Sequence, residues 1–281
     1  MELISLKYAI FVIVLLVLYY CFPKKYRWYV LLAGSMAYYV IICKWYVLFI
    51  IFTICTTYGS TIWIDKLLKK QNAIVKSHKE DWDRQTRKEY KEKGRKKRVA
   101  VMLFALLCNF GILAFLKYIP YAGELGLLLP LGISFYTFQS MGYVMDVYRE
   151  IVEPEKNFLK VALFVSFFPQ IIQGPIAIYD KLAGQLYEGH SLRLENLQKG
   201  ALLVLWGVMK KLVIADRAVN IINFVMDKPM DFSGTYVFFA AVVYALQLYA
   251  DFSGGIDIVR GIAEMFGITM STNFNHPYFS R

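Results

Sequence analysis

The chain has 281 residues, of which 58% are hydrophobic, 17% aromatic and 19% charged, and its net charge is +11 at pH 7. Soluble domains usually carry about 45–50% apolar and about 25% charged residues, so this composition argues against a soluble protein and indicates a membrane protein. The positive charge is concentrated in one segment without a zinc-finger or RNA-binding signature, so we expect no nucleic-acid partner.

Apolar stretches recur along the chain, and several approach the roughly 20 residues that a transmembrane helix needs. About eight are present, at residues 8–22, 28–43, 46–64, 99–116, 127–147, 158–172, 200–215 and 236–250. The first has no signal-peptide cleavage site, so we interpret it as an uncleaved span. The sequence therefore predicts an all-α polytopic membrane protein with about eight transmembrane or re-entrant helices, embedded in membrane lipids.

Residues 65–98 contain 14 basic and 6 acidic residues. Lys/Arg excess in loops marks the cytoplasmic side, so we expect this segment inside and the N-terminus outside. Its first half has apolar residues near helical spacing and predicts an interfacial amphipathic helix, with a solvated linker as the alternative. The apolar and aromatic positions are Ile64, Leu67, Leu68, Ile74, Val75, His78 and Trp82.

The stretch at residues 127–147 carries polar residues on one helical stripe. Tyr136, Gln139, Tyr143 and Asp146 are separated by three, four and three positions. A polar stripe inside a membrane span must face protein or water. Two interpretations remain open: the stripe lines a substrate path, or it forms ordinary hydrogen bonds between helices.

The next stretch contains two prolines, Pro169 and Pro175, with Gln173 and Gly174 between them. Proline removes a backbone donor and clashes with the preceding turn, so the sequence predicts a broken helix. A broken helix at membrane depth survives only inside protein or beside a cavity, and we therefore expect Gln173 on the substrate path. An ordinary loop at the membrane surface is the alternative.

Tyr244, Gln247 and Asp251 share one face of the last apolar stretch and predict a lined cavity, with packing between helices as the alternative. Ionisable groups at membrane depth are costly and usually functional. Asn273 follows in an Asn/Pro/aromatic loop and is predicted to lie on the same path. His276, the histidine of that loop, is more typical of a structural residue than of a catalytic one.

Asp257, Arg260 and Glu264 occupy another face of the same segment. Arg260 and Glu264 are four residues apart and can pair along a helix. We interpret this second face as a solvated ion-pair surface.

No metal or bound-cofactor site is predicted. The four cysteines, at positions 21, 43, 55 and 108, form no C-x-x-C pair. The phosphate-binding, dinucleotide-binding, zinc-protease and serine-hydrolase motifs are all absent.

Four blocks of sequence resemble the membrane-bound O-acyltransferase family, in particular the subgroup of the alginate O-acetyltransferase membrane subunit. They are LPLGISFYTFQSMGYVMDVYR, FFPQIIQGPI, WGVMKKLVIADR and YADFSGGIDIVRGIAEMFGI with the following NFNHPYFSR, and they occur in the family's order. The resemblance extends from Leu129 to the end of the chain, and residues 1–128 resemble the family only in having spans and a basic loop.

The resemblance implies a helical membrane enzyme with a central funnel. Such an enzyme takes an acyl group from a cytoplasmic donor, acetyl-CoA or another acyl thioester, and transfers it to a hydroxyl of an exported or cell-surface polysaccharide. It also implies an extracytoplasmic acetyltransferase partner protein and a location in the bacterial plasma membrane. The family's catalytic histidine follows the Asn-Phe-x-x-Pro-Tyr loop and has no counterpart here, so we assign no catalytic residue and expect this chain alone to be inactive.

The expected organisation has three parts: N-terminal spans at residues 1–64, the basic cytoplasmic segment at 65–98, and an acyltransferase-like core at 99–281 that lacks the family's C-terminal part. Two other functions fit the residues alone. A transporter or channel would also use a broken helix and intramembrane acids. A non-catalytic scaffold subunit is the third possibility.

Overall fold

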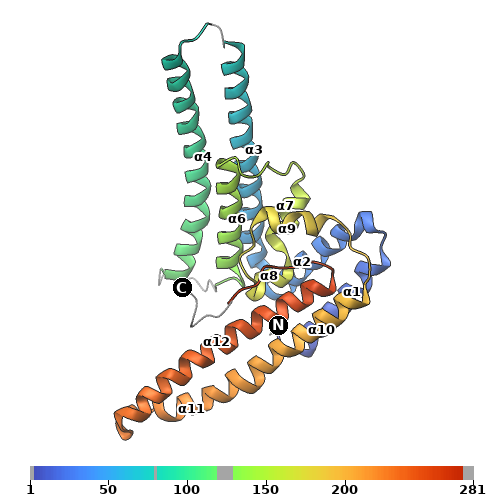
Figure 1. Ribbon diagram of the computed structural model, residues 1–281, viewed down its shortest axis with the longest axis vertical. Helices are drawn as coiled ribbons and strands as arrows, with labels where there is room; N and C mark the ends of the chain where they lie inside the picture. Colours follow the sequence, from blue (N-terminus) through green and yellow to red (C-terminus); the bar gives the residue numbers. More distant parts are fainter. Residues whose placement is uncertain (1–2, 79–80, 119–128, 275–281) are drawn as a thin grey trace. The chain divides into compact units, whose positions relative to one another are not determined.

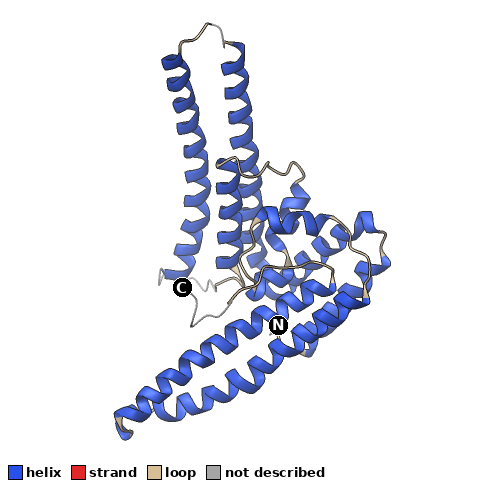
Figure 2. Cartoon of the chain, in the orientation of Figure 1, coloured by secondary structure: helices blue, strands red, loops and turns tan. Residues whose placement is uncertain are grey.

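The computed structural model describes residues 3–78, 81–118 and 129–274, and every regular element in these ranges is a helix (Figure 2). By length and composition, three helical runs in the described residues are long and apolar enough to cross a membrane: Lys24–Ser77, Arg84–Tyr118 and Gly234–Met265. Shorter apolar helices cover Leu6–Cys21 and Phe158–Gln173. The predicted class, an all-α membrane protein, is confirmed. The eight spans and the central funnel stay predictions.

The chain divides into two compact units. Unit 1 comprises Met1–Leu31, Ile172–Pro175 and Glu188–Arg281, and unit 2 comprises Leu32–Ile171 and Ile176–Tyr187. Unit 1 contains α1 (Leu6–Cys21), α10 (Leu194–Met209), η3 (Lys210–Ala215), α11 (Asp216–Met226) and α12 (Gly234–Met265). Unit 2 contains α3 (Val47–Ser77), α4 (Arg84–Tyr118), α6 (Ile133–Tyr148), α7 (Phe158–Ser166) and α9 (Tyr179–Tyr187). The boundary passes through α2 (Arg27–Cys43) and α8 (Phe168–Gln173).

A long hairpin of α3 and α4 forms the core of unit 2, and α6 packs against both helices (Figure 1). Lys44, whose φ is +48°, begins the short 3₁₀ turn η2 (Lys44–Tyr46) that joins α2 to α3. Asp83 precedes α4 and accepts a hydrogen bond from the Thr86 N–H at 3.0 Å. Hydrogen bonds from the Thr86 side chain and backbone lower the pKa of Asp83, as expected for a carboxylate at a helix N-terminus.

Residues 64–77, predicted as a separate interfacial helix, are instead the last turns of α3. No proline interrupts Val47–Ser77, so the helix continues from its apolar part into its charged part. The alternative, a solvated linker after about Arg84, is not found either, because residues 84–98 are helical and form the first turns of α4. The cytoplasmic position of this segment stays a prediction.

Candidate functional site

In unit 1, α10 packs side by side with the C-terminal half of α12, and η3 and α11 continue along the rest of α12 (Figure 1). Two pairs of glycines allow this close approach. A Cβ added at Gly200 would lie 2.5 Å from the Gly261 carbonyl oxygen, and one added at Gly254 would lie 2.8 Å from the Gly207 carbonyl oxygen. Small residues at such positions let helix backbones meet, which is a common packing mode in membranes.

The helical run from α10 to α11 contains one turn of π-helix, η3, at Lys210–Ala215. π-Turns inside α-helices are rare and frequently occur at functional sites. The turn begins three residues after Gly207, where α10 contacts α12. Lys210 and Lys211 therefore lie directly against α12.

Both lysines pair with carboxylates of α12. Lys210 Nζ donates to Asp257 Oδ2 at 2.6 Å, and Lys211 Nζ forms an ion pair with Asp251 Oδ1. Arg260 also donates to Asp257, with 3.3 Å between Nη1 and Oδ1. We call these five residues the charged cluster; it holds three cationic groups and two carboxylates.

The two halves of the charged cluster differ in accessibility. The Asp257 side chain is 12% exposed, and its partners Lys210 and Arg260 are similarly enclosed. Asp251 is 34% exposed and Lys211 24%. A buried ion pair mainly preserves the fold, because removing one partner leaves an uncompensated charge. The Lys211–Asp251 pair, in contrast, remains reachable by a ligand.

Gln173 also belongs to this region of unit 1. Its side-chain amide occupies the space beside Gly255 of α12, where a Cβ would collide with it. The hydroxyl of Ser253, two residues earlier, is buried and has no hydrogen-bond partner among the described residues. Of the predicted path residues, Asp251 therefore belongs to α12, and Gln173 packs against the same helix one turn further on, at Gly255.

Three other residues predicted for the path lie elsewhere. Tyr244 is 52% exposed and Gln247 is partly exposed, both on the part of α12 before the charged cluster. Asn273 is exposed in the segment after α12. His276 lies outside the described residues.

The polar stripe of α6 lies in unit 2 and is mostly buried. Tyr136, Gln139 and Tyr143 are each 3% exposed or less, whereas Asp146 is partly exposed. Tyr143 accepts a hydrogen bond from the Glu155 N–H at 2.8 Å, and its ring stacks on another tyrosine. These contacts join α6 to its neighbours, and the substrate path along the stripe stays a prediction.

The predicted helix break is present, between α7 and α8 at Phe167. The buried backbone groups that the break frees are bonded by side chains of other helices in unit 2. Gln139 Nε2 donates to the Phe164 carbonyl at 2.8 Å, and the Phe168 N–H donates to Ser35 Oγ at 3.1 Å. A buried, unpaired backbone group is costly, so these two contacts stabilise the broken backbone.

The prediction for the second face of α12 was wrong. Asp257 is buried and pairs with Lys210, whereas we expected it on a solvated surface. Arg260 pairs with Asp257 rather than with Glu264, and Glu264 accepts a hydrogen bond from Thr269 at 3.1 Å. The face turns inward because the glycines of α12 bring α10 and η3 onto it.

The sequence interpretation also missed Lys210 and Lys211. The signal was present, since two adjacent lysines lie inside the apolar stretch 200–215 and ionisable groups at such depth suggest a site.

Among the described residues no group of His, Cys, Asp and Glu side chains could hold a metal ion.

The chain is similar to enzymes that modify bacterial envelope polymers. Over 215 residues, 63% of its length, it is 33% identical to a peptidoglycan O-acetyltransferase of Helicobacter pylori and covers 41% of that protein. Over 156 residues, 55% of its length, it is 36% identical to a probable alginate O-acetylase AlgI of Pseudomonas syringae pv. tomato and covers 29% of it. A teichoic acid D-alanyltransferase of Bacillus subtilis is 26% identical over 157 residues, 54% of the chain and 39% of the relative.

No family model matches the chain. The relatives are nevertheless all members of the membrane-bound O-acyltransferase family, and the chain is related to that family over more than half of its length. This finding confirms the resemblance predicted from the four sequence blocks. The chain spans less than half the length of each of these relatives.

Proposed function

We propose that the protein takes part in transferring an acyl group to a hydroxyl of a cell-envelope polysaccharide, as a membrane O-acyltransferase. The observation that carries this proposal is the set of relatives. Their names specify acetyl transfer to peptidoglycan, acetylation of alginate and D-alanyl transfer to teichoic acid. The three reactions share one chemical step, the formation of an ester on an envelope polymer.

The charged cluster supplies groups suited to this step. Lys211 is partly exposed and held by Asp251, so its ammonium group can donate to an oxygen of the acyl group. Fixed donors placed where negative charge develops stabilise acyl-transfer transition states, especially where water is scarce. The inner group of Asp257, Lys210 and Arg260 fixes η3 against α12 and thereby positions the Lys211–Asp251 pair.

The donor in this proposal is acetyl-CoA or another acyl thioester that reaches the protein from the cytoplasm. The acceptor is a polysaccharide of the cell surface or one being exported. An extracytoplasmic acetyltransferase completes the transfer as a partner protein. The protein itself is a multi-pass component of the bacterial plasma membrane, and the family resemblance supports each of these assignments.

The proposal is tested in cells with and without the gene. Envelope polysaccharides are extracted, and their ester-linked acyl groups are quantified by mass spectrometry after mild base release. We expect deletion to remove one class of acyl ester and the restored gene to return it. Unchanged ester content in every extracted polymer would contradict the proposed function.

A further inference from the structure

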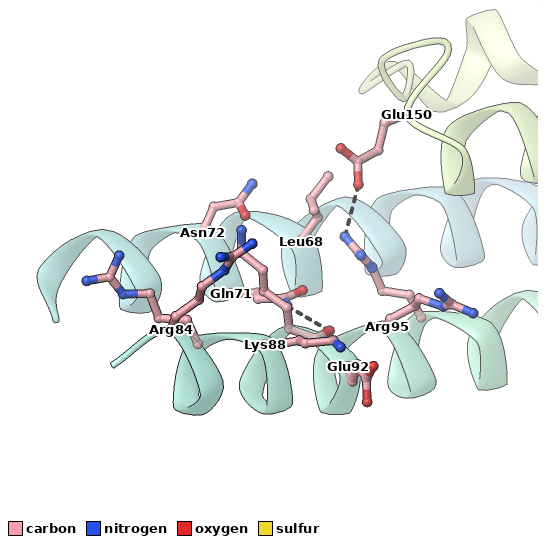
Figure 3. Close-up of a pocket in the computed structure, with 11 residues that line it drawn as sticks. Leu68, Gln71, Asn72, Arg84, Lys88, Glu92, Arg95 and Glu150 are labelled. Atoms are coloured by element: carbon pink, nitrogen blue, oxygen red, sulfur yellow. Dashed lines mark hydrogen bonds and ion pairs between the residues drawn. The ribbon is translucent and has the colours of Figure 1, made fainter. Parts of the chain in front are cut away.

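A basic cleft lies in unit 2, between α3 and α4 of the hairpin (Figure 3). Its volume is about 650 Å³. Six cationic side chains and two carboxylates line it: Arg84, Arg87, Lys88, Lys91, Arg95 and Arg98, with Glu92 and Glu150. The acyl-transfer function assigns no role to it.

Five of the six cationic residues occur at the helical spacing that apolar residues usually follow on a packed helix face. Positions 84, 88, 91, 95 and 98 of α4 are separated by four, three, four and three residues. This spacing puts them on one face of the helix, the one that shares the cleft with Leu68, Gln71 and Asn72 of α3. Like charges at such spacing destabilise a helix, so a bound anion would relieve the repulsion.

The walls of the cleft are fixed by specific contacts. Gln71 of α3 is buried, and its Nε2 donates to the Lys91 carbonyl at 2.9 Å. Gly94 provides the space for this side chain, since a Cβ there would lie 2.5 Å from Gln71. These contacts hold the two helices at a constant separation.

Glu150 closes one end of the cleft. Its backbone has φ +63°, and its carboxylate lies 3.3 Å from Arg98 Nη1. Arg98 Nε is buried and has no acceptor among the described residues. The Glu150 carboxylate is therefore already paired with Arg98, and the other cationic side chains of the cleft outnumber the one remaining carboxylate, Glu92.

The length of the cleft distinguishes between possible anions. From Arg84 to Arg98 the helix rises about 21 Å, at 1.5 Å per residue. The apolar part of α4 begins at Val99, and the headgroup layer beyond the hydrocarbon is only about 5–8 Å thick. A lipid headgroup would reach Arg98 and Arg95, whereas Arg84, Arg87 and Lys88 would lie in the aqueous phase.

We propose that this cleft binds a soluble ligand that carries at least two phosphate groups. Arginine's planar donors suit bidentate contacts with phosphate, and four arginines are spread along the cleft. This proposal does not depend on the acyl-transfer reaction.

Binding of inorganic pyrophosphate to the full chain in detergent, measured by calorimetry, tests the proposal. The variant Arg87→Gln/Lys91→Gln removes two charges from the cleft. Its matched control, Lys93→Gln/Lys96→Gln, removes two exposed charges of α4 that do not line the cleft. We expect the cleft variant to weaken binding at least about tenfold and the control to change it less than about threefold. Without ligand, the cleft variant should melt no lower than the wild type, because it relieves repulsion.

Three results would overturn the proposal. Pyrophosphate that fails to bind the wild type would exclude the ligand class. Equal losses in both double variants would show only general attraction of anions to α4. The third result is a preference for phosphatidylglycerol nanodiscs over phosphatidylcholine nanodiscs that is lost in the cleft variant. Together with an absence of pyrophosphate binding, it would identify a lipid site instead.

Discussion

Lys210 and Asp257 lie 2.6 Å apart, Nζ to Oδ2, and join the π-turn of η3 to the C-terminal half of α12. The two residues are 47 positions apart in the chain, and both side chains are largely enclosed. Their contact and the glycine pairs beside it explain why two helices with charged residues pack closely in an apolar environment.

The first prediction concerns this contact. Asp257→Asn leaves Lys210 and Arg260 without their carboxylate, so we expect the free energy of unfolding to fall by about 3 kcal/mol. Thermal melting in detergent measures the change. Glu195→Gln, which removes the exposed partner of Lys199, is the control and should leave the melting temperature unchanged. If the Asp257→Asn variant and the control both melted at the same temperature as the wild type, a structural role for Asp257 would be contradicted.

The second prediction concerns the crossing of α10 and α12. A methyl group at Gly207 would collide with the Gly254 carbonyl oxygen, so Gly207→Ala should destabilise unit 1 by about 1–3 kcal/mol. At Gly59 of α3 no heavy atom lies within 4 Å of an added Cβ. Gly59→Ala should therefore be neutral or slightly stabilising, because alanine favours the helix. A neutral Gly207→Ala variant would show that the helices do not approach as closely as described.

The third prediction concerns the broken helix. Gln139→Leu leaves the Phe164 carbonyl buried without its side-chain donor, which should cost about 1–3 kcal/mol. Gln85→Leu changes an exposed glutamine of α4 in the same chemical way and should have little effect. Hydrogen exchange around residues 164–168 should rise in the first variant alone. Unchanged exchange and melting would mean that the break needs no support from α6.

The fourth prediction concerns topology. Ser77 is exposed at the end of α3, within the basic segment that we expect on the cytoplasmic side. Ser77→Cys, in a background with the four native cysteines changed to serine, should react with a membrane-impermeant maleimide only after the cells are opened. Ready labelling of intact cells would reverse the proposed orientation.

Much of the helical framework could be predicted from the apolar runs, but the helix ends could not. The run at 236–250 corresponds to α12, yet the helix continues to Met265 through Gly254 and Gly255. Glycines lower helix propensity in isolation, whereas here Gly254 allows α10 to approach and Gly255 leaves space for the Gln173 side chain. Likewise α4 begins at Arg84, well before the apolar run at 99–116.

The candidate site could be predicted only in part. Asp251 was identifiable as a carboxylate in an apolar stretch, but its partner Lys211 is 40 residues away. Sequence spacing shows which residues share a helical face and does not show which face meets another helix. That limit also explains why Asp257 was expected on the surface.

The measurement that tests the account most directly is acyl transfer per folded protein for Asp251→Asn, in membranes from cells that make the protein. Ester-linked acyl groups on the envelope polysaccharide are divided by the amount of folded protein from size-exclusion chromatography. If the Lys211–Asp251 pair acts on the acyl path, transfer should fall at least about tenfold, because the Lys211 donor loses the carboxylate that positions it, while folded yield stays near that of the wild type. Transfer equal to that of the wild type, at equal folded yield, would contradict the central claim.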